Sequence, residues 1–136
     1  MKLIIRNTEL LSEKYLYRNL FDYSSSDNLS GYAINNSTGA LVQNSSYGCS
    51  YKIPVSYKND THLTMSMLTS PWDESSRAIP QDPSFYIVVY GENDVLLSWG
   101  TQVTIDARAK YVRMQWWGNY GISAPWGIKL NYGQSF

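Results

Sequence analysis

Three of the five tryptophans of this chain lie within residues 109–126, among arginine, glutamine and asparagine side chains. A flat aromatic ring can bury the apolar C–H face of a pyranose, and neighbouring amide, guanidinium and carboxylate groups can bond the sugar's hydroxyls. No catalytic sequence signature accompanies the stretch. These residue types therefore predict a site for a saccharide rather than for a metabolite or a metal ion.

The expected binding residues divide by chemistry into two groups. Four aromatic residues are expected to stack against sugar rings: Trp72, Trp117, Tyr120 and Trp126. Four polar residues are expected to bond hydroxyls: Asp73, Arg113, Gln115 and Asn119. They come from two regions of the chain, the loop around residue 72 and the segment 113–126.

The segment 110–117 is predicted to be a strand, and its period of two assigns its side chains to faces. Three of them share a face expected to lie in the core: Val112, Met114 and Trp116. The other face is expected to be wetter and carries Tyr111, Arg113, Gln115 and Trp117. Trp99 ends an apolar strand and is also predicted in the core.

Two loops carry the remaining candidates. The long segment 69–84 contains three prolines and the pair Trp72–Asp73, and loops of this length are often functional. The segment 118–125 holds Tyr120 and leads to Trp126. For the aromatic residues of both loops, packing within the loop is the open alternative to ligand contact.

Catalysis is not predicted. His62, the sole histidine, lies close to Asp60 and to serines, but no Gly-x-Ser-x-Gly motif is present. Glycosidases need two carboxylates at a defined separation. The candidates all fall in loops, with no spacing that brings them together: Asp73, Glu74, Asp82, Glu92 and Asp94. The chain is therefore expected not to be an enzyme and to need no cofactor.

A structural calcium ion is left open. Asp22, Asp27 and Asn28 supply the hard oxygen ligands that calcium prefers, but their order does not match an EF-hand loop. No metal site is predicted.

Charge and cysteine content restrict the classes of partner. Eleven basic and eleven acidic residues give zero formal net charge, which argues against a nucleic-acid partner. Cys49 is the single cysteine, so no intrachain disulfide can form and a free buried thiol is expected. No apolar run approaches the roughly 20 residues that span a bilayer, so membrane insertion is not expected. The opening residues 1–9 do not resemble a signal peptide.

The remaining pattern predicts short strands separated by turns. A hairpin is expected from residues 32–34 and 40–42, another from 84–90 and 95–99, and further strands from 61–68, 102–106 and 127–132. Residues 51–55 contain Pro54, which favours an edge position. With 15% aromatic residues and no βαβ rhythm, the chain is predicted to be all-β, an antiparallel sandwich.

A single domain is expected over residues 1–136, with residues 1–19 as a possible flanking segment. The only plausible helix spans residues 8–19, where Thr8 could act as the N-cap. Ile4 and Ile5 before it are more typical of a strand.

Six segments form an ordered pattern along the chain: Asn19–Asp22, Gly31–Asn35, Gly39–Val42, Tyr47–Val55, Tyr86–Leu97 and Val103–Arg113. This pattern resembles one that is common in tail and baseplate proteins of phages that infect Gram-positive bacteria. Within the last segment, Asp106 stands where those modules usually have proline. Together the segments span residues 19–117.

This resemblance implies a jelly-roll-like β-sandwich in the virion, at the tail tip or baseplate, made in the host cytoplasm. Its implied partners are host cell-wall saccharide and other phage tail or baseplate proteins. The motif is largely structural, so it assigns no binding residue. A structural or oligomerisation domain of a tail protein, with its aromatic residues buried between subunits, is the alternative function.

Overall fold

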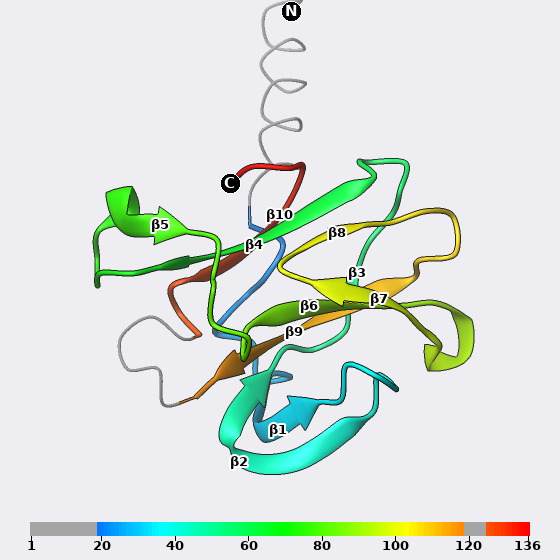
Figure 1. Ribbon diagram of the computed structural model, residues 1–136, viewed down its shortest axis with the longest axis horizontal. Coiled ribbons are helices and arrows are strands. Elements are labelled where there is room, and N and C mark those ends of the chain that lie inside the picture. Colours follow the sequence, from blue (N-terminus) through cyan, green and yellow to red (C-terminus); the bar gives the residue numbers. More distant parts are fainter. Residues whose placement is uncertain (1–18, 119–124) are drawn as a thin grey trace, which may run out of the picture.

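The computed structural model describes residues 19–118 and 125–136, and these residues form two antiparallel β-sheets (Figure 1). Within these ranges there is no α-helix, only the short 3₁₀ turns η1 (Glu74–Ser76) and η2 (Glu92–Asp94). The all-β class and the sandwich-like antiparallel architecture are confirmed, while the jelly-roll-like connectivity stays a prediction. The helix expected at residues 8–19 lies almost wholly outside the described residues.

The larger sheet has six strands, with the order β1-β2-β9-β6-β7 and β3 alongside β9. Their bounds are β1 Leu29–Ile34, β2 Leu41–Cys49, β3 Ile53–Pro54, β6 Tyr86–Tyr90, β7 Leu96–Gly100 and β9 Tyr111–Trp117. Both expected hairpins are present, β1 with β2 and β6 with β7. β3 pairs with β9 alone, which agrees with the edge position expected from Pro54.

The smaller sheet has four strands, with β10-β4-β5 in order and β8 alongside β4. Their bounds are β4 His62–Leu68, β5 Arg77–Ala78, β8 Gln102–Thr104 and β10 Ile128–Tyr132. In Figure 1, β4 and β10 lie above β6 and β9, and β1 and β2 lie below them.

The core lies between the two sheets, where alternate residues of each strand point inward. β4 contributes Leu63, Met65 and Met67, and β9 contributes the side chains of 112, 114 and 116. The predicted core face of residues 110–117 is therefore confirmed, with Trp116 only 4% exposed. Phe21 packs against Trp116 with ring centroids 5.6 Å apart, which attaches the chain before β1 to this core.

The outer face of β4 carries polar side chains, and most of that face is buried. Thr64 and Ser66 are both fully buried. The Thr64 hydroxyl donates to the Gly133 carbonyl at 2.7 Å, and Arg77 donates to the Ser66 hydroxyl at 3.1 Å. The segment after β10 and the arginine side chain cover the strand, and each buried hydroxyl has a hydrogen-bond partner.

A second apolar cluster lies on the outer face of the larger sheet, beneath the β1–β2 hairpin. It consists of Ile34, Cys49, Tyr86, Val88 and Tyr90. The Tyr86 hydroxyl donates to the Ile34 carbonyl at 2.5 Å, and the Tyr90 hydroxyl donates to the Gly39 carbonyl at 2.6 Å. The hairpin therefore bends over the face that the strand pattern alone left open to water.

Trp99 was expected in the core, and this expectation is wrong. It lies on β7 opposite Val88 and is 51% exposed. Its ring meets that of Tyr86 edge to face, with centroids 5.4 Å apart. The β1–β2 hairpin buries Val88 on this face, but Trp99 lies on the edge strand β7 and is not part of the cluster that the hairpin covers.

Candidate functional site

Two of the predicted aromatic residues, Trp72 and Trp126, stack on each other. Their ring centroids are 4.6 Å apart and their planes differ by 24°. Trp72 comes from the connection between β4 and β5, and Trp126 lies just before β10. Trp72 is 87% exposed, the largest exposed fraction among the exposed large hydrophobic side chains. We call this pair the tryptophan platform.

The backbone of Trp72 is held in an uncommon conformation. Its φ is +62°, a left-handed geometry that costs a non-glycine residue about 1–2 kcal/mol. The surrounding loop offsets this cost with hydrogen bonds: the Ser76 hydroxyl donates to the Asp73 carbonyl at 2.6 Å and accepts from the Ser70 N–H at 2.9 Å. Strained backbone conformations of this kind are common at functional sites, where contacts with the surrounding residues hold them in place.

Asp73, a predicted hydroxyl partner, has a structural task beside the platform. It is the N-cap of η1, and its Oδ1 accepts from the Ser75 N–H at 3.0 Å and from the Ser75 hydroxyl. The bonds found for this carboxylate all go to Oδ1. Its Oδ2 is thus the atom that suits a ligand hydroxyl.

Arg77 joins the two segments that carry the platform. Its side chain is 7% exposed, and Nη1 donates to Ser66 Oγ and to the Gly127 carbonyl, both at 3.1 Å. Its Nε and Nη2 donate to the Glu74 carboxylate at 2.7 and 3.0 Å. Gly127 follows Trp126, and Glu74 lies two residues after Trp72, so one guanidinium group positions both tryptophans.

The carboxylate of Glu74 is held in its charged form. The hydrogen bonds from Arg77 are the main reason that its pKa falls from 4.5 to about 2, with help from Lys129, whose Nζ is 3.2 Å away. The rim of the platform therefore carries fixed charges and hydrogen-bonding groups beside a flat apolar surface.

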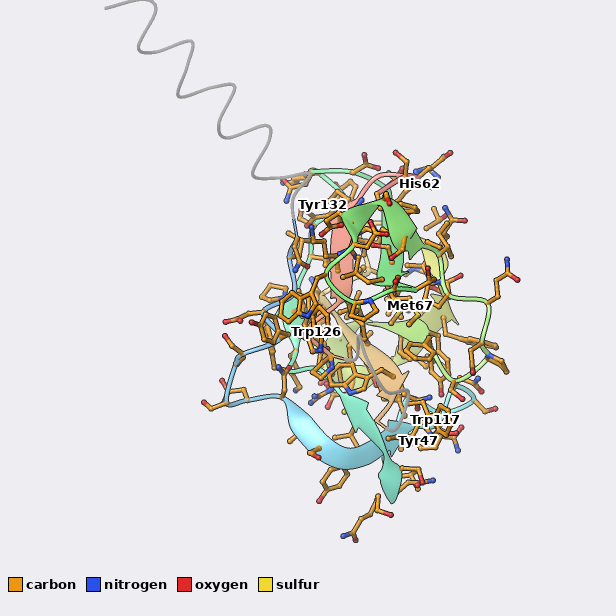
Figure 2. All side chains as sticks on the ribbon, turned by 90° about the vertical axis from the view of Figure 1, so that its left-hand side faces the viewer. Tyr47, His62, Met67, Trp117, Trp126 and Tyr132 are labelled. Atoms are coloured by element: carbon orange, nitrogen blue, oxygen red, sulfur yellow. The ribbon has the colours of Figure 1, made fainter. Side chains whose placement is uncertain are left out.

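Trp117, the third predicted stacking residue, lies apart from the platform. It ends β9, is 37% exposed and pairs with Tyr47 of β2. In Figure 2, Tyr47 and Trp117 lie close together, and Trp126 lies at a different level of the molecule. Asn119 and Tyr120 lie outside the described residues.

Gln115 was expected on a solvent-facing surface, and this expectation is wrong. It is 3% exposed. Its Oε1 accepts from the Ile34 N–H at 2.7 Å and lies 3.0 Å from the Tyr86 hydroxyl oxygen, and its Nε2 donates to the Ser84 carbonyl at 2.9 Å. The amide connects the covering hairpin to the sheet, so it is not available to a ligand.

A group of residues that the sequence did not single out lies under the hairpin tip. The rings of Tyr90 and Tyr111 stack with centroids 4.7 Å apart, and Lys52 Nζ sits 4.8 Å from the centre of the Tyr111 ring. The Tyr111 hydroxyl donates to the Asp94 carboxylate, which also meets Lys52 at 3.5 Å. Both faces of Tyr111 are thus covered, which excludes a stacked sugar.

The electrostatics of this group follow from burial and the Asp94 contact. Burial raises the pKa of Tyr90 to about 12. Burial and then the hydrogen bond to Asp94 raise the pKa of Tyr111, and the same bond is the main cause of the lowered pKa of Asp94. Neither tyrosine is suited to act as a base near neutral pH.

Arg113, a predicted hydroxyl partner, belongs to this group and not to the platform. It lines a hollow of about 360 Å³ together with Lys52, Asp94 and residues 38–41. Its Nη1 donates to the Ser50 carbonyl at 2.8 Å. A sequence signal for this group does exist, because Asn and Asp tolerate positive φ. Asn93 and Asp94 both adopt it in the turn between β6 and β7, and Asp94 accepts from Tyr111 of β9.

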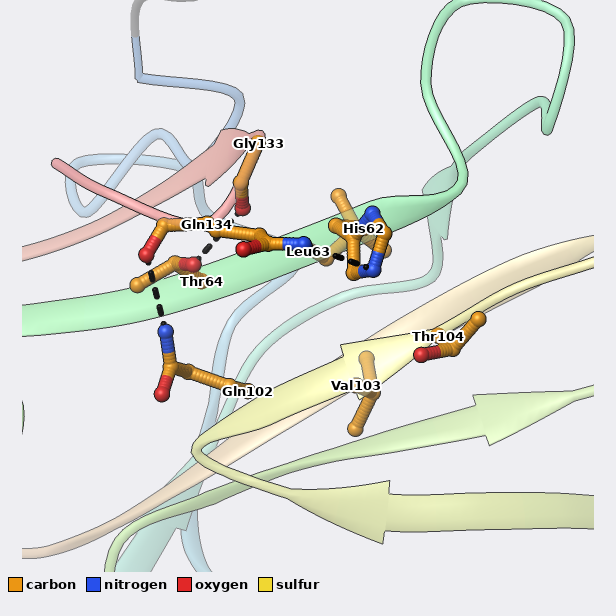
Figure 3. A pocket seen from close by; sticks show the side chains of 8 residues that line it. All are labelled: His62, Leu63, Thr64, Gln102, Val103, Thr104, Gly133 and Gln134. Carbon is orange, nitrogen blue, oxygen red and sulfur yellow. Dashed lines mark hydrogen bonds between the residues drawn. The ribbon is translucent and has the colours of Figure 1, made fainter.

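His62 lines a second hollow, of about 200 Å³, between β8 and the segment after β10 (Figure 3). Its Nδ1 lies 3.6 Å from Asp60, and its Nε2 lies 3.0 Å from the side-chain nitrogen of Gln134. An amide nitrogen only donates, so in the neutral ring this Nε2 accepts.

Within residues 19–118 and 125–136, no group of three or more His, Cys, Asp or Glu side chains is placed to hold a metal ion. No helix of that part of the chain is long and apolar enough to cross a membrane. Cys49 is a free thiol and fully buried, and burial raises its pKa.

Comparison with models of protein families, with curated proteins and with solved structures finds no match to this chain. The function is therefore inferred from the chemistry of these surfaces.

Proposed function

We propose that this chain is a non-catalytic carbohydrate-binding module. The observation that carries the proposal is the tryptophan platform: Trp72 is 87% exposed, has a left-handed backbone and stacks on Trp126. An indole ring left in water gives up the apolar burial that tryptophan normally contributes. A pyranose laid on the platform would restore that burial through its C–H face.

The rim of the platform supplies the polar part of such a site. Asp73 Oδ2, the Glu74 carboxylate and the Lys129 ammonium, which is 42% exposed, can bond hydroxyls around a stacked ring. Charged donors and acceptors make the stronger hydrogen bonds of a protein surface. Arg77 contributes indirectly, because it positions the segments that carry both tryptophans.

The biological setting we propose is attachment of a phage tail or baseplate to host cell-wall polysaccharide, located in the virion. The order of motifs over residues 19–117 supports it, and so does the chemistry of the platform. Single sites of this kind can be weak, because repeated copies on a virion raise avidity through effective concentration.

Tryptophan fluorescence of the purified protein, titrated with soluble Gram-positive wall polysaccharides, tests the proposal. Saturable quenching is expected for the wild type and should be lost in Trp72→Ala, which keeps the fold because its ring is exposed. The matched control is Trp99→Ala, which also removes an exposed indole, on β7, and should bind like the wild type.

An equal loss of binding in both variants would contradict a site at the platform. A stable oligomer that dissociates in Trp72→Ala, with no polysaccharide bound by either form, would favour the alternative function of an oligomerisation domain. Sedimentation velocity on the same samples separates the two functions.

A further inference from the structure

Trp116 combines a buried ring with an indole N–H that has no hydrogen-bond partner among the described residues. The residue is 4% exposed and packs against Phe21 in the core. Buried tryptophans usually satisfy this N–H group. Across the described chain, the one fully buried side-chain nitrogen or oxygen without a partner is Ser98 Oγ. Nε1 of Trp116 therefore keeps contact with a space outside the core.

That space is a hollow of about 300 Å³ beside β2, which we call the Trp116 hollow. Its walls include Asn28, Ser30, Ser45, Tyr47 and Gly48. The nitrogen-bearing edge of the indole lies over Gly48, where an added Cβ would come within 2.4 Å of Nε1. The absence of a side chain at residue 48 therefore leaves room for the donor at the floor of the hollow.

Among the described residues, the lining is polar and carries no ionised group. It offers a side-chain amide, two serine hydroxyls, a phenol and an indole N–H, beside Gly118 and Pro125. An anionic group placed here would lose its hydration without gaining an opposite charge. Neutral hydroxyls, which donate and accept, match this set of partners.

We propose that the Trp116 hollow binds one neutral, hydroxyl-bearing pyranose unit, with Trp116 Nε1–H donating to an oxygen of the sugar. This inference rests on the proposed function and adds a second subsite and a class of ligand to it. The hollow lies at the lower end of the size range of small-ligand pockets.

The hollow and the platform are neighbours along the chain. Pro125 lines the hollow and the next residue, Trp126, forms half of the platform. An oligosaccharide long enough to reach both would place one unit on Trp72 and the hydroxyls of another in the hollow. Linked contacts of this kind raise affinity without strengthening either subsite.

The test is nuclear magnetic resonance of the whole chain labelled with ¹⁵N-tryptophan, in which each indole N–H gives its own signal. Single Trp→Phe variants assign the signals. The probes are glucose, galactose, rhamnose and N-acetylglucosamine, with glucuronic and galacturonic acids as anionic counterparts. We expect saturable displacement of the Trp116 signal by at least one neutral sugar and no displacement by the uronic acids.

Two variants localise the effect. Ser45→Leu fills the hollow from an exposed position on β2 and should abolish displacement of the Trp116 signal while leaving the core intact. Trp116→Phe keeps an aromatic ring against Phe21 but removes the donor, and should weaken sugar binding. Trp99→Phe is the matched control. It removes an indole N–H on β7, at the opposite edge of the larger sheet from β1 and β2, and should bind as the wild type.

The outcomes separate this inference from the proposed function. If the Trp72 and Trp126 signals are displaced and the Trp116 signal is not, the proposed sugar subsite in the hollow is overturned and the proposed site at the platform is retained. Equal displacement of the Trp116 signal by neutral sugars and uronic acids would overturn the assigned ligand class. If none of the probes displaces any indole signal, both proposals are overturned.

Discussion

Residues with similar sequence surroundings take opposite roles in this protein. Gln115 and Trp117 share one face of β9, yet the first is buried and the second is partly exposed. The difference arises because the β1–β2 hairpin covers the middle of that face and not its end. The exposure of a single residue therefore depends on a segment about 80 positions away, as the Ile34 to Gln115 hydrogen bond shows.

Replacement of Gln115 by alanine should destabilise the protein without affecting the platform. The change leaves the buried Ile34 N–H without its acceptor, which typically costs about 1–3 kcal/mol. Urea unfolding measures the loss. Gln43→Ala, on the exposed part of β2, is the control and should be near neutral. Equal stability of the two variants would contradict the role given to the buried amide.

Glu74 should make stability depend on pH in the acid range. Its pKa is about 2 in the folded chain, below the ordinary value of 4.5 that it has once the chain unfolds, so folding favours the charged form. This contribution is fully present above pH 4.5 and is lost as the pH falls toward 2. The effect is modest because the side chain is 63% exposed and screened by solvent.

Urea unfolding of the wild type and of Glu74→Gln across this range tests the expected sign. The stability difference between the two proteins should be largest above pH 4.5 and should shrink on acidification. A difference that grows as the pH falls would contradict the ion pairs of Glu74 with Arg77 and Lys129.

At the scale of elements, the strands follow local patterns and the platform does not. The alternation of 110–117 and the turn residues at 35–39 and 91–94 act through near neighbours, so these elements could be predicted from the sequence. The stacking of Trp72 on Trp126 depends on the approach of the β4–β5 connection to the segment before β10. No local pattern encodes that approach, although the chemistry of both residues marks them as candidates.

Other errors at this scale have the same origin. The apolar residues before Trp99 predict a core position, but its burial depends on whether another segment packs over that face of β7. The Tyr111, Asp94 and Lys52 group was missed because it assembles from three separate strands and turns. Periodicity assigns a side chain to a face, and tertiary packing decides whether that face is covered.

Arg77 is the positioning residue of the platform, and Arg77→Lys should disturb the platform without touching a ligand. A lysine cannot bond Ser66, Gly127 and Glu74 together, because its charge is a single point rather than a planar fork. We expect polysaccharide binding to weaken several-fold. The exciton-coupled circular dichroism signal of the stacked indoles should also decrease. A lower stability alone would not reduce this signal under conditions in which the protein stays folded.

The control for this variant is Arg108→Lys, at an exposed ion pair with Asp106. It should leave both the binding and the dichroism unchanged. If Arg77→Lys keeps both the circular dichroism signal of the stacked indoles and full polysaccharide binding, the positioning role of Arg77 is contradicted.

For the whole molecule, the zero formal net charge and the two packed sheets describe a neutral scaffold, with the exposed Trp72 of the platform on its surface. Such a scaffold attracts a charged polymer weakly at long range. Binding of a neutral polysaccharide through stacking should therefore be nearly independent of salt. Titrations at low and high sodium chloride measure this, and a steep loss of affinity with salt would indicate a charged ligand instead.

The most direct measurement of the central claim is the labelling of intact Gram-positive cells by the fluorescently tagged protein. A carbohydrate-binding role predicts saturable labelling that soluble wall polysaccharide competes away, that Trp72→Ala abolishes and that Trp99→Ala preserves. Absence of labelling across a broad panel of strains and their polysaccharides, even with the protein multimerised, would contradict it.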